Sequence, residues 1–340
     1  MNRIIYRSKL KSPLTKDFDK HLFSLADYYN SLFTSNDPKK IMEFYNHFKT
    51  NEELIEWMKD RPKGVSYIHE VDGNKDIVVV IPTVDINGKY AKTCKDEIFK
   101  GLHIIFVESG VGNYYFNYAH NVNVGIKKAL VYNPKWIIVS NDDMYKIDPP
   151  EKLVKELSKI DCSKVDAVFT KRTRYHSVPT YIGRITNLYI LYLLLTFQLE
   201  RIYFHKKFNI KYNFILSERH SLSIKALARK YLTPNICHNC EFIVTMSFAI
   251  FSSNFFRKVN NYYDETYINA VEDSDISFRL FLENRNYTII DYKIGDMEGM
   301  TFGKGKLRDL RSRASTVYFN YKFQKYLSNL ENSNFNKNKL

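Results

Sequence analysis

The sequence is poor in cysteine, glycine and proline. Its 340 residues include 12 glycines, 9 prolines and four cysteines, which are Cys94, Cys162, Cys237 and Cys240. So few and such scattered cysteines exclude a disulfide scaffold and favour a reducing compartment. The low glycine and proline content excludes fibrous and low-complexity classes. The first residues, MNRIIYRSKLKSPL, have charges within any apolar core, so we expect no signal peptide and a cytoplasmic location.

Basic and aromatic residues are abundant. The net charge is +14, and 26 tyrosines and 24 phenylalanines contribute to a hydrophobic content of 44%. Such a chain can bury a large core, and its charge favours anionic partners such as nucleotides, nucleic acid or acidic lipid headgroups. The charge is equally compatible with a lysine-rich composition that affects only solubility. No recognised nucleic-acid-binding module accompanies it, so we expect no nucleic-acid partner.

Residues 1–75 are expected to form an N-terminal helical region. The segments DKHLFSLADYYNSLF and KKIMEFYNHFK have apolar residues at helical spacing, and TNEELIEWMKD begins with a capping signal. The segments RPKG and VDGNKD then interrupt the helical pattern. No motif in this region indicates a function.

Strands and helices are predicted to alternate from residue 76 onward. The apolar runs that predict strands lie at 76–84, 101–110, 135–143 and 165–172. Helical patterns lie between them at 117–133 and 149–160. This order predicts an α/β fold with a mostly parallel mixed sheet covered by helices on both faces. Ligands of such sheets bind beyond the carboxyl ends of the strands.

Residues 180–238 interrupt this alternation and are expected to form a helical insertion. Their segment ITNLYILYLLLTFQL (185–199) contains no charge, whereas Arg184, Arg201 and Lys206 flank it. It is shorter than the about 20 residues that a membrane span needs. A core helix, a helix on a membrane surface or in a lipid-acceptor groove, and a span all remain open.

Adjacent acids follow the apolar run that ends near residue 140. Asn141, Asp142 and Asp143 come directly after it. Oxygen ligands at a strand end can hold Mg²⁺ or Mn²⁺ together with substrate phosphates. A solvated turn, or an aspartate that caps the next helix, explains the same residues without a metal.

A second acidic cluster precedes a helical pattern. Glu272, Asp273 and Asp275 lie at the predicted helix N-terminus, and Arg279 follows one turn later. Mutual repulsion can raise the pKa of one of these carboxyl groups and make it a general base. Helix capping is the alternative explanation.

Other signals are weaker. Asp85 and Glu108 each follow a predicted strand and could accept hydrogen bonds from a nucleoside, or be ordinary loop acids. The pair Cys237 and Cys240 has no second ligand pair, so a loop or strand start is favoured over a zinc site. The patterns GxxxxGK[ST], GxSxG and a GxGxxG after a strand are absent.

Taken in order, these segments resemble family 2 glycosyltransferases with the GT-A fold, in particular the rhamnosyl- and galactofuranosyl-transferase-like branch. The resemblance covers residues 76–179 and 240–320. Its segments are VVVIPTVD, IIFVESG, NVNVGIKKAL, IIVSNDDMYKIDP, AVEDSDISFRLFLENRNYTI and GDMEGMTFG. The fifth resembles the family's EDxDLxxRxxxxGY segment and is the most specific of them.

The resemblance implies roles for individual residues. Asp273 would be the catalytic base, supported by Glu272 and Asp275. The metal, Mn²⁺ or Mg²⁺, would be contacted by Asp143 with Asn141 or Asp142. The residues assigned to the donor nucleotide sugar and its surroundings are Thr83, Asp85, Glu108, Asn123, Asp142 and Arg279, the last as a brace of the acidic helix.

The sequence departs from the family pattern at three places. Val122 stands where the family has arginine, and Asn286 where it has glycine. The metal-binding histidine has no histidine counterpart, and Asp296 or Glu298 falls near its place. An acid can still bind Mn²⁺ or Mg²⁺, but a changed metal preference or a degenerate enzyme is an alternative.

The expected function is therefore an inverting, metal-dependent glycosyltransferase. It would move a sugar from a nucleoside-diphosphate sugar to a saccharide or lipid-linked acceptor hydroxyl. The glycosyltransferase domain would span 76–320, with a tail at 321–340 and membrane contact on the cytoplasmic face through the 180–238 insertion. The alternative is a non-catalytic nucleotide-sugar-binding or glycan-binding protein on the same scaffold.

Overall fold

The computed structural model of the chain describes residues 16–170, 177–216, 224–234, 242–259, 262–297 and 305–337. Its strands are β1 (Tyr67–Val71), β2 (Asn74–Thr83), β3 (Leu102–Glu108), β4 (Trp136–Ser140), β5 (Met144–Lys146), β6 (Ala167–Thr170), β7 (Val178–Arg184), β8 (Tyr212–Leu216), β9 (Phe242–Val244), β10 (Phe248–Ser252), β11 (Tyr287–Ile290) and β12 (Ile294–Asp296).

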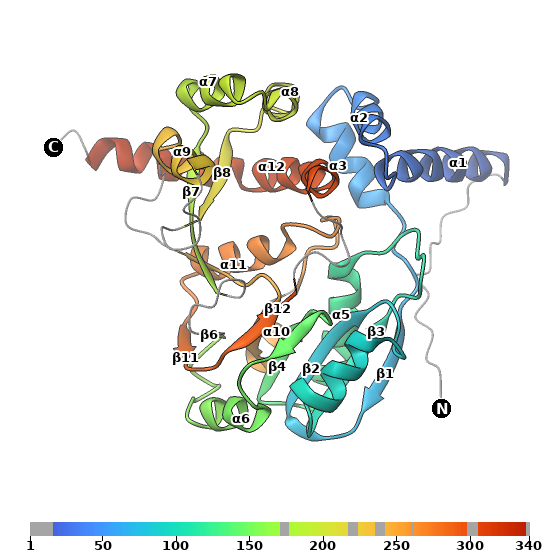
Figure 1. The fold of residues 1–340 in the computed structure, drawn as a ribbon, viewed down its shortest axis with the longest axis vertical. Coiled ribbons are helices and arrows are strands. Elements are labelled where there is room, and N and C mark those ends of the chain that lie inside the picture. Colours follow the sequence, from blue (N-terminus) through green and yellow to red (C-terminus); the bar gives the residue numbers. More distant parts are fainter. Residues whose placement is uncertain are drawn as a thin grey trace.

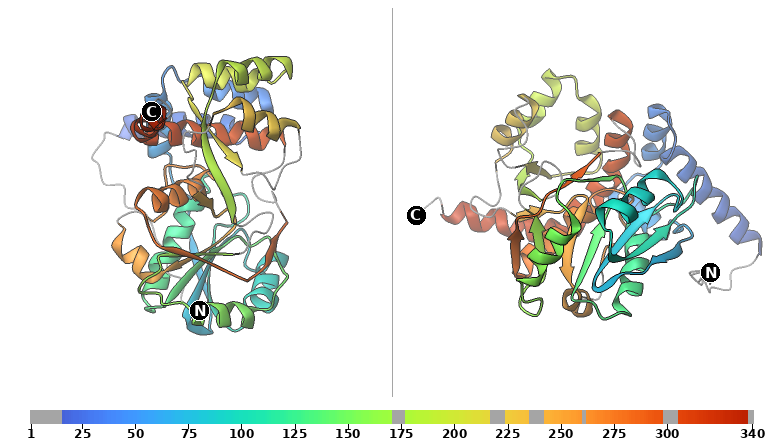
Figure 2. Two further views of the ribbon diagram at one scale, coloured as in Figure 1. Left: turned by 90° about the vertical axis from the view of Figure 1, so that its left-hand side faces the viewer. Right: turned by 60° about the horizontal axis from the view of Figure 1, so that its bottom comes forward.

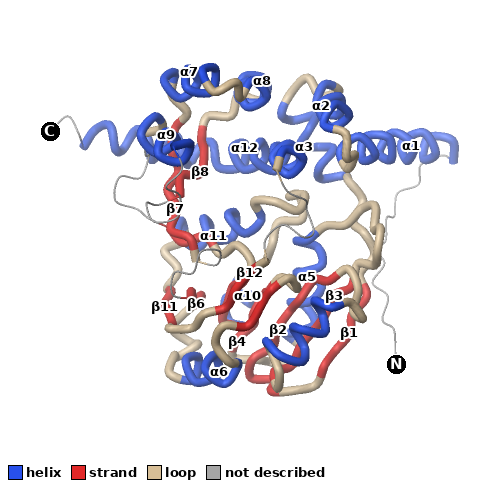
Figure 3. Tube along the Cα trace, viewed as in Figure 1, coloured by secondary structure: helices blue, strands red, loops and turns tan. Residues whose placement is uncertain are grey.

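Its α-helices are α1 (Lys16–Phe33), α2 (Pro38–Asn46), α3 (Asn51–Asp60), α4 (Lys89–Thr93), α5 (Tyr118–Leu130), α6 (Pro150–Ser158), α7 (Asn187–Leu195), α8 (Leu199–Lys207), α9 (Ile224–Leu232), α10 (Ser253–Lys258), α11 (Glu272–Leu282) and α12 (Lys306–Lys337). The large sheet occupies one end of the molecule, α11 and α12 lie above it, and α7 and α8 lie at the opposite end (Figures 1 and 3).

The large sheet has seven strands in the order β1-β3-β2-β4-β10-β6-β11. The pairs β2–β3, β2–β4 and β6–β11 are parallel. The pairs β1–β3, β4–β10 and β10–β6 are antiparallel. The α/β fold and the mixed sheet are confirmed, but the sheet is only partly parallel. The reasons are that β1 runs antiparallel to β3 at one edge and that β10, which follows the insertion, runs antiparallel between β4 and β6.

Helices cover both faces of this sheet, as its solid apolar strands predicted. Val79 and Ile81 of β2 pack with residues of α4 and α6 on one face. Val78 and Val80 pack with α5, α10 and α11 on the other face, since side chains alternate along a strand. A Cβ atom on Gly125 of α5 would lie 2.3 Å from Val80 Cγ1, so glycine permits the close approach of this helix.

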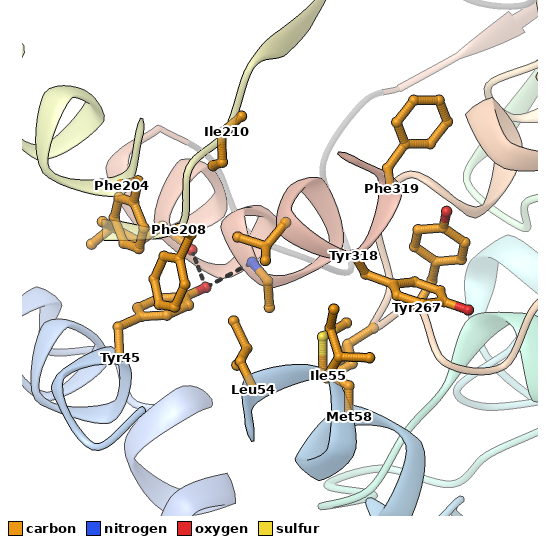
Figure 4. Close-up of a cluster of buried hydrophobic side chains, with 14 of the residues drawn as sticks. Tyr45, Leu54, Ile55, Met58, Phe204, Phe208, Ile210, Tyr267, Tyr318 and Phe319 are labelled. Atoms are coloured by element: carbon orange, nitrogen blue, oxygen red, sulfur yellow. Dashed lines mark hydrogen bonds between the residues drawn. The ribbon is translucent and has the colours of Figure 1, made fainter. Parts of the chain in front are cut away.

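The N-terminal helices dock on the C-terminal helix in a separate aromatic-rich core. The fully buried Tyr45 of α2 donates a hydrogen bond to Leu310 O at 2.8 Å and accepts one from Ala314 N at 3.0 Å (Figure 4). Because α12 runs without interruption from 306 to 337, it crosses the boundary at 320 that we expected between domain and tail.

Two parts of the chain contain strands that the sequence did not indicate. Residues 67–71, within the expected N-terminal helical region, form the edge strand β1. The insertion contains helices α7, α8 and α9 but also β7 and β8, which join β9 in a three-stranded sheet. Figure 2 shows β7 extending from the end of the molecule that holds α7 and α8 toward the large sheet. No helix in the described ranges is long and apolar enough to cross a bilayer.

Candidate functional site

A cavity of about 370 Å³ lies where the strand ends meet the start of α11. The parallel strands β2 and β4 bring their carboxyl ends to one edge of the sheet. The predicted residues that line this cavity are Thr83, Asn141, Asp142, Asp143, Glu272 and Asp273. The two acidic clusters, about 130 residues apart in sequence, therefore share one cavity.

The strand-end acids are held in place by the ends of β2 and β4. Asp142 Oδ2 accepts a hydrogen bond from Thr83 Oγ1 at 2.7 Å. Burial raises the pKa of Asp142, although the Thr83 hydrogen bond opposes the rise. Asp143 is also buried, with 4% of its surface exposed. Asn141 N donates to Ser247 O at 2.9 Å, which fixes the backbone just before the acids.

A strained residue sets the start of α11. Val271, the residue before the helix, has φ 73° and ψ −9°, a left-handed conformation that is unfavourable for a β-branched side chain. Asn269 has φ 54° in the same cavity wall. Strain of this kind persists only where surrounding structure imposes it, and it concentrates at functional sites.

Glu272 and Asp273 are the acids most perturbed by this environment. Glu272 is 7% exposed, and its Oε2 atom has no hydrogen-bond partner in the described part of the chain. Burial and the charge of Asp273 raise the pKa of Glu272 to about 8. Burial raises the pKa of Asp273 to about 6, against the hydrogen bond from Ser274 N at 2.6 Å. At neutral pH Glu272 is thus largely protonated, whereas Asp273 is ionised and basic enough to take a proton.

Asp275 and Arg279 lie outside the cavity lining and stabilise the helix instead. Asp275 is fully buried and accepts hydrogen bonds from Arg279 Nε at 2.7 Å, Lys322 Nζ at 2.6 Å and Tyr267 OH at 2.9 Å. Lys322 belongs to α12, so this network joins α11 to α12. Arg279 bonds to Asp275 one turn earlier in α11, and its assignment to the surroundings of the donor stays a prediction.

The residues expected to hold the nucleoside do not line the cavity. Asp85 is exposed and caps its own turn by accepting from Asn87 N at 2.9 Å. Glu108 accepts from Ile86 N at 3.2 Å and contacts His69 Nε2 at 2.8 Å. These acids therefore fix the loop after β2, and their contact with a nucleoside stays a prediction.

Asn123 is likewise engaged in the protein interior. Its side chain donates to Tyr263 O at 2.8 Å and to Glu265 Oε1 at 2.9 Å, and it accepts from Tyr263 N at 2.9 Å. It ties α5 to the loop before α11. A direct role in donor binding stays a prediction.

The expected metal ligands are only partly brought together. Asp296 pairs with Met144 across β5 and β12, and Met297 N donates to Asp143 O at 3.0 Å, so the two segments are adjacent. Glu298, Cys237 and Cys240 lie outside the described residues. Within the described ranges, no three His, Cys, Asp or Glu side chains are grouped closely enough to hold a metal ion. Asp142, Asp143 and the Oε2 atom of Glu272 nevertheless line the cavity with carboxyl oxygens, the ligands that Mg²⁺ and Mn²⁺ prefer.

Sequence reasoning missed several residues of the cavity. Tyr118 of α5, Asn269, and Arg308 and Ser312 of α12 all line it. The only hint of Arg308 was the basic run RDLRSR (308–313), near the end of the expected domain, and nothing in that run indicated which arginine faces the acids. The chain matches no protein-family model and no curated protein sequence.

Proposed function

We propose that the protein is an inverting glycosyltransferase that uses a nucleoside-diphosphate sugar and has a GT-A-type fold. The observation on which this rests is the shared cavity. Acids at the end of β4 and a carboxyl group with a pKa of about 6 on α11 line the same space of about 370 Å³. A partly parallel sheet with strand ends at that cavity supports the same conclusion.

Asp273 would act as the general base. Its carboxylate takes the proton of an acceptor hydroxyl while the oxygen forms a bond to the anomeric carbon of the donor. The bond from that carbon to the diphosphate oxygen breaks, and its electron pair leaves with the nucleoside diphosphate. Attack from the face opposite the leaving group inverts the configuration. Protonated Glu272 keeps a second negative charge away from the base.

The leaving diphosphate needs positive charge. Arg308 is the cationic side chain among the described residues of the cavity lining, and guanidinium groups bind phosphate oxygens well. Asp142 and Asp143, with Asn141 or Asp296, would hold Mg²⁺ or Mn²⁺. When bound, such an ion would neutralise charge on the diphosphate.

The surface of α7 supports an acceptor that lies near a membrane. Leu188, Leu191 and Leu195 are 63%, 50% and 71% exposed and share one face of this uncharged helix. Tyr189 and Leu193 on the other face are buried against Ile202. An apolar face of this kind suits the interface of a bilayer. We therefore infer a lipid-linked or glycan acceptor presented at the cytoplasmic face of a membrane.

The Asp273→Asn variant tests the proposal, with Asp60→Asn as the control because Asp60 is exposed on α3 and does not line the cavity. Donors are first screened by thermal shift with Mn²⁺, since a selective ligand raises the melting temperature. We expect Asp273→Asn to bind the selected donor normally and to lose at least about 100-fold in turnover. The Asp60→Asn control should keep both donor binding and turnover.

Each outcome has a defined meaning. Undiminished turnover by Asp273→Asn would remove this residue from the role of base. If the wild type binds a donor but neither transfers nor hydrolyses it, the protein is a non-catalytic binder. If it neither binds nor cleaves any nucleotide sugar, the proposal fails.

A further inference from the structure

A second, smaller cavity adjoins the candidate active site. It has a volume of about 160 Å³ and lies between α7, α8, β8, α9 and α12. Ser312 of α12 lines both cavities. The space is less than half of that at the acidic site, and its charge has the opposite sign.

Three arginines from three helices line this cavity. They are Arg201 of α8, Arg229 of α9 and Arg313 of α12. Asp309 is the acid that offsets them, and its Oδ1 atom accepts from Arg201 Nη2 at 3.2 Å and from Arg313 Nη2 at 2.5 Å. Arg229 has no ion-pair partner among the described residues. The described cavity wall therefore has an excess of two positive charges.

A buried histidine adds an unused hydrogen-bonding group. His205 is 6% exposed, and its Nδ1 atom has no hydrogen-bond partner in the part of the chain that the structure describes. Burial, followed by the charges of Arg313, Arg201 and Arg229, lowers the pKa of His205 to about 4. The neutral ring can donate one hydrogen bond without adding charge. Arg313 itself is only 8% exposed.

Arg313 is buried and Arg201 and Arg229 are partly buried, and positive charge withdrawn from water is unfavourable unless an anion or acidic group compensates it. We propose that this cavity binds a phosphate group through Arg201, Arg229, Arg313 and His205. Guanidinium groups match the geometry of phosphate oxygens. The small volume suits one phosphate group rather than a nucleotide sugar, whose place is the larger cavity. This site does not depend on the proposed glycosyltransferase activity.

Two sources can supply a phosphate group with this chemistry. One is free inorganic phosphate, and the other is the headgroup of a phospholipid. Tyr189 of α7 lines the cavity, and the opposite face of α7 exposes Leu191 and Leu195. The two arms of the experiment distinguish the sources.

The first arm titrates the full chain with inorganic phosphate by calorimetry at constant ionic strength. Arg229→Gln is the key variant, because Arg229 has no acidic partner among the described residues, so its removal leaves none of their carboxylates unpaired. Arg257→Gln on α10 removes the same charge from an exposed position that lines neither cavity. We expect saturable phosphate binding by the wild type. The affinity for phosphate should fall about tenfold or more in Arg229→Gln and stay unchanged in Arg257→Gln.

The second arm measures flotation with vesicles of phosphatidylcholine, with or without phosphatidic acid. Retention that requires both phosphatidic acid and Arg229 identifies a lipid headgroup. Saturable binding of inorganic phosphate without such retention identifies free phosphate. If Arg229→Gln does not fold, Arg201→Gln, at a partly exposed position, replaces it.

The proposal is overturned if the wild type shows no saturable phosphate binding and both variants float equally with acidic vesicles. Equal losses in Arg229→Gln and Arg257→Gln overturn it too, because they would show only attraction by the net charge of +14. Donor turnover should be unchanged in both variants. The phosphate-binding test can be carried out, and keeps its meaning, even if the protein proves to have no glycosyltransferase activity.

Discussion

Asp273 and Asp275 are two residues apart, yet replacement by asparagine should change stability in opposite directions. Burial raises the pKa of Asp273 from 3.8 to about 6. Since one pKa unit equals 1.36 kcal/mol, its ionised form costs the folded state at most about 3 kcal/mol. Asp275, in contrast, accepts three hydrogen bonds, two of them from Arg279 and Lys322. Loss of its charge should cost about 3 kcal/mol.

The pH dependence of stability shows why the replacement of Asp273 should stabilise the protein. Below pH 3.8 Asp273 is protonated in both folded and unfolded chains, so its ionisation costs nothing. Between pH 3.8 and about 6 the unfolded chain loses the proton first, and stability falls as the pH rises. Above about pH 6 the full cost is present. Asp273→Asn should therefore be more stable than the wild type at pH 8, with a gain that vanishes toward pH 4.

Urea unfolding of the wild type, Asp273→Asn and Asp275→Asn measures these differences at several pH values. The buffer contains a chelator, since a bound cation would stabilise the ionised carboxylate. If Asp273→Asn is no more stable than the wild type at pH 8, or if its gain is the same at pH 4, the account of the buried acids is wrong. An Asp275→Asn variant as stable as the wild type would refute the structural role of the α11–α12 network.

Two further predictions concern the metal and the surface of α7. EDTA should abolish sugar transfer, and added Mn²⁺ or Mg²⁺ should restore it; full activity in chelator would exclude a metal role for Asp142 and Asp143. Leu191→Ser should weaken flotation with lipid vesicles several-fold, because it removes an exposed apolar contact worth about 1 kcal/mol or more. Val131→Ser, which removes another exposed apolar side chain (73% exposed), is its control, and an equal loss in both variants would argue against a specific α7 surface.

Much of the fold could be predicted because its central strands are continuous apolar runs. Val78 to Ile81, Ile104 to Val107 and Ile137 to Val139 are buried on both faces, and few other structures accommodate such runs. The edge strand β1 was missed because YIHEV is short and half-exposed. Its polar His69 and Glu70 gave no strand signal.

The site could be predicted where function follows from position in a fold. A strand end and a helix N-terminus placed Asp143 and Asp273 in one cavity. The same reasoning could not separate Asp273 from Asp275, because the contact that engages Asp275 comes from Lys322, almost 50 residues later. Nor could it identify Arg308, whose place depends on how α12 crosses the cavity.

Helix α12 connects parts of the molecule that are distant in sequence. Its residues Leu310 and Ala314 hold Tyr45 of the N-terminal helices, Arg308 faces the acidic cavity, and Lys322 holds Asp275. A chain cut after residue 320 would keep every residue that lines the acidic cavity. It would still lose Lys322, whose ammonium group compensates the fully buried carboxylate of Asp275 on α11. A shortened form of this protein should therefore be destabilised at α11, which carries the proposed base, although the removed residues line neither cavity.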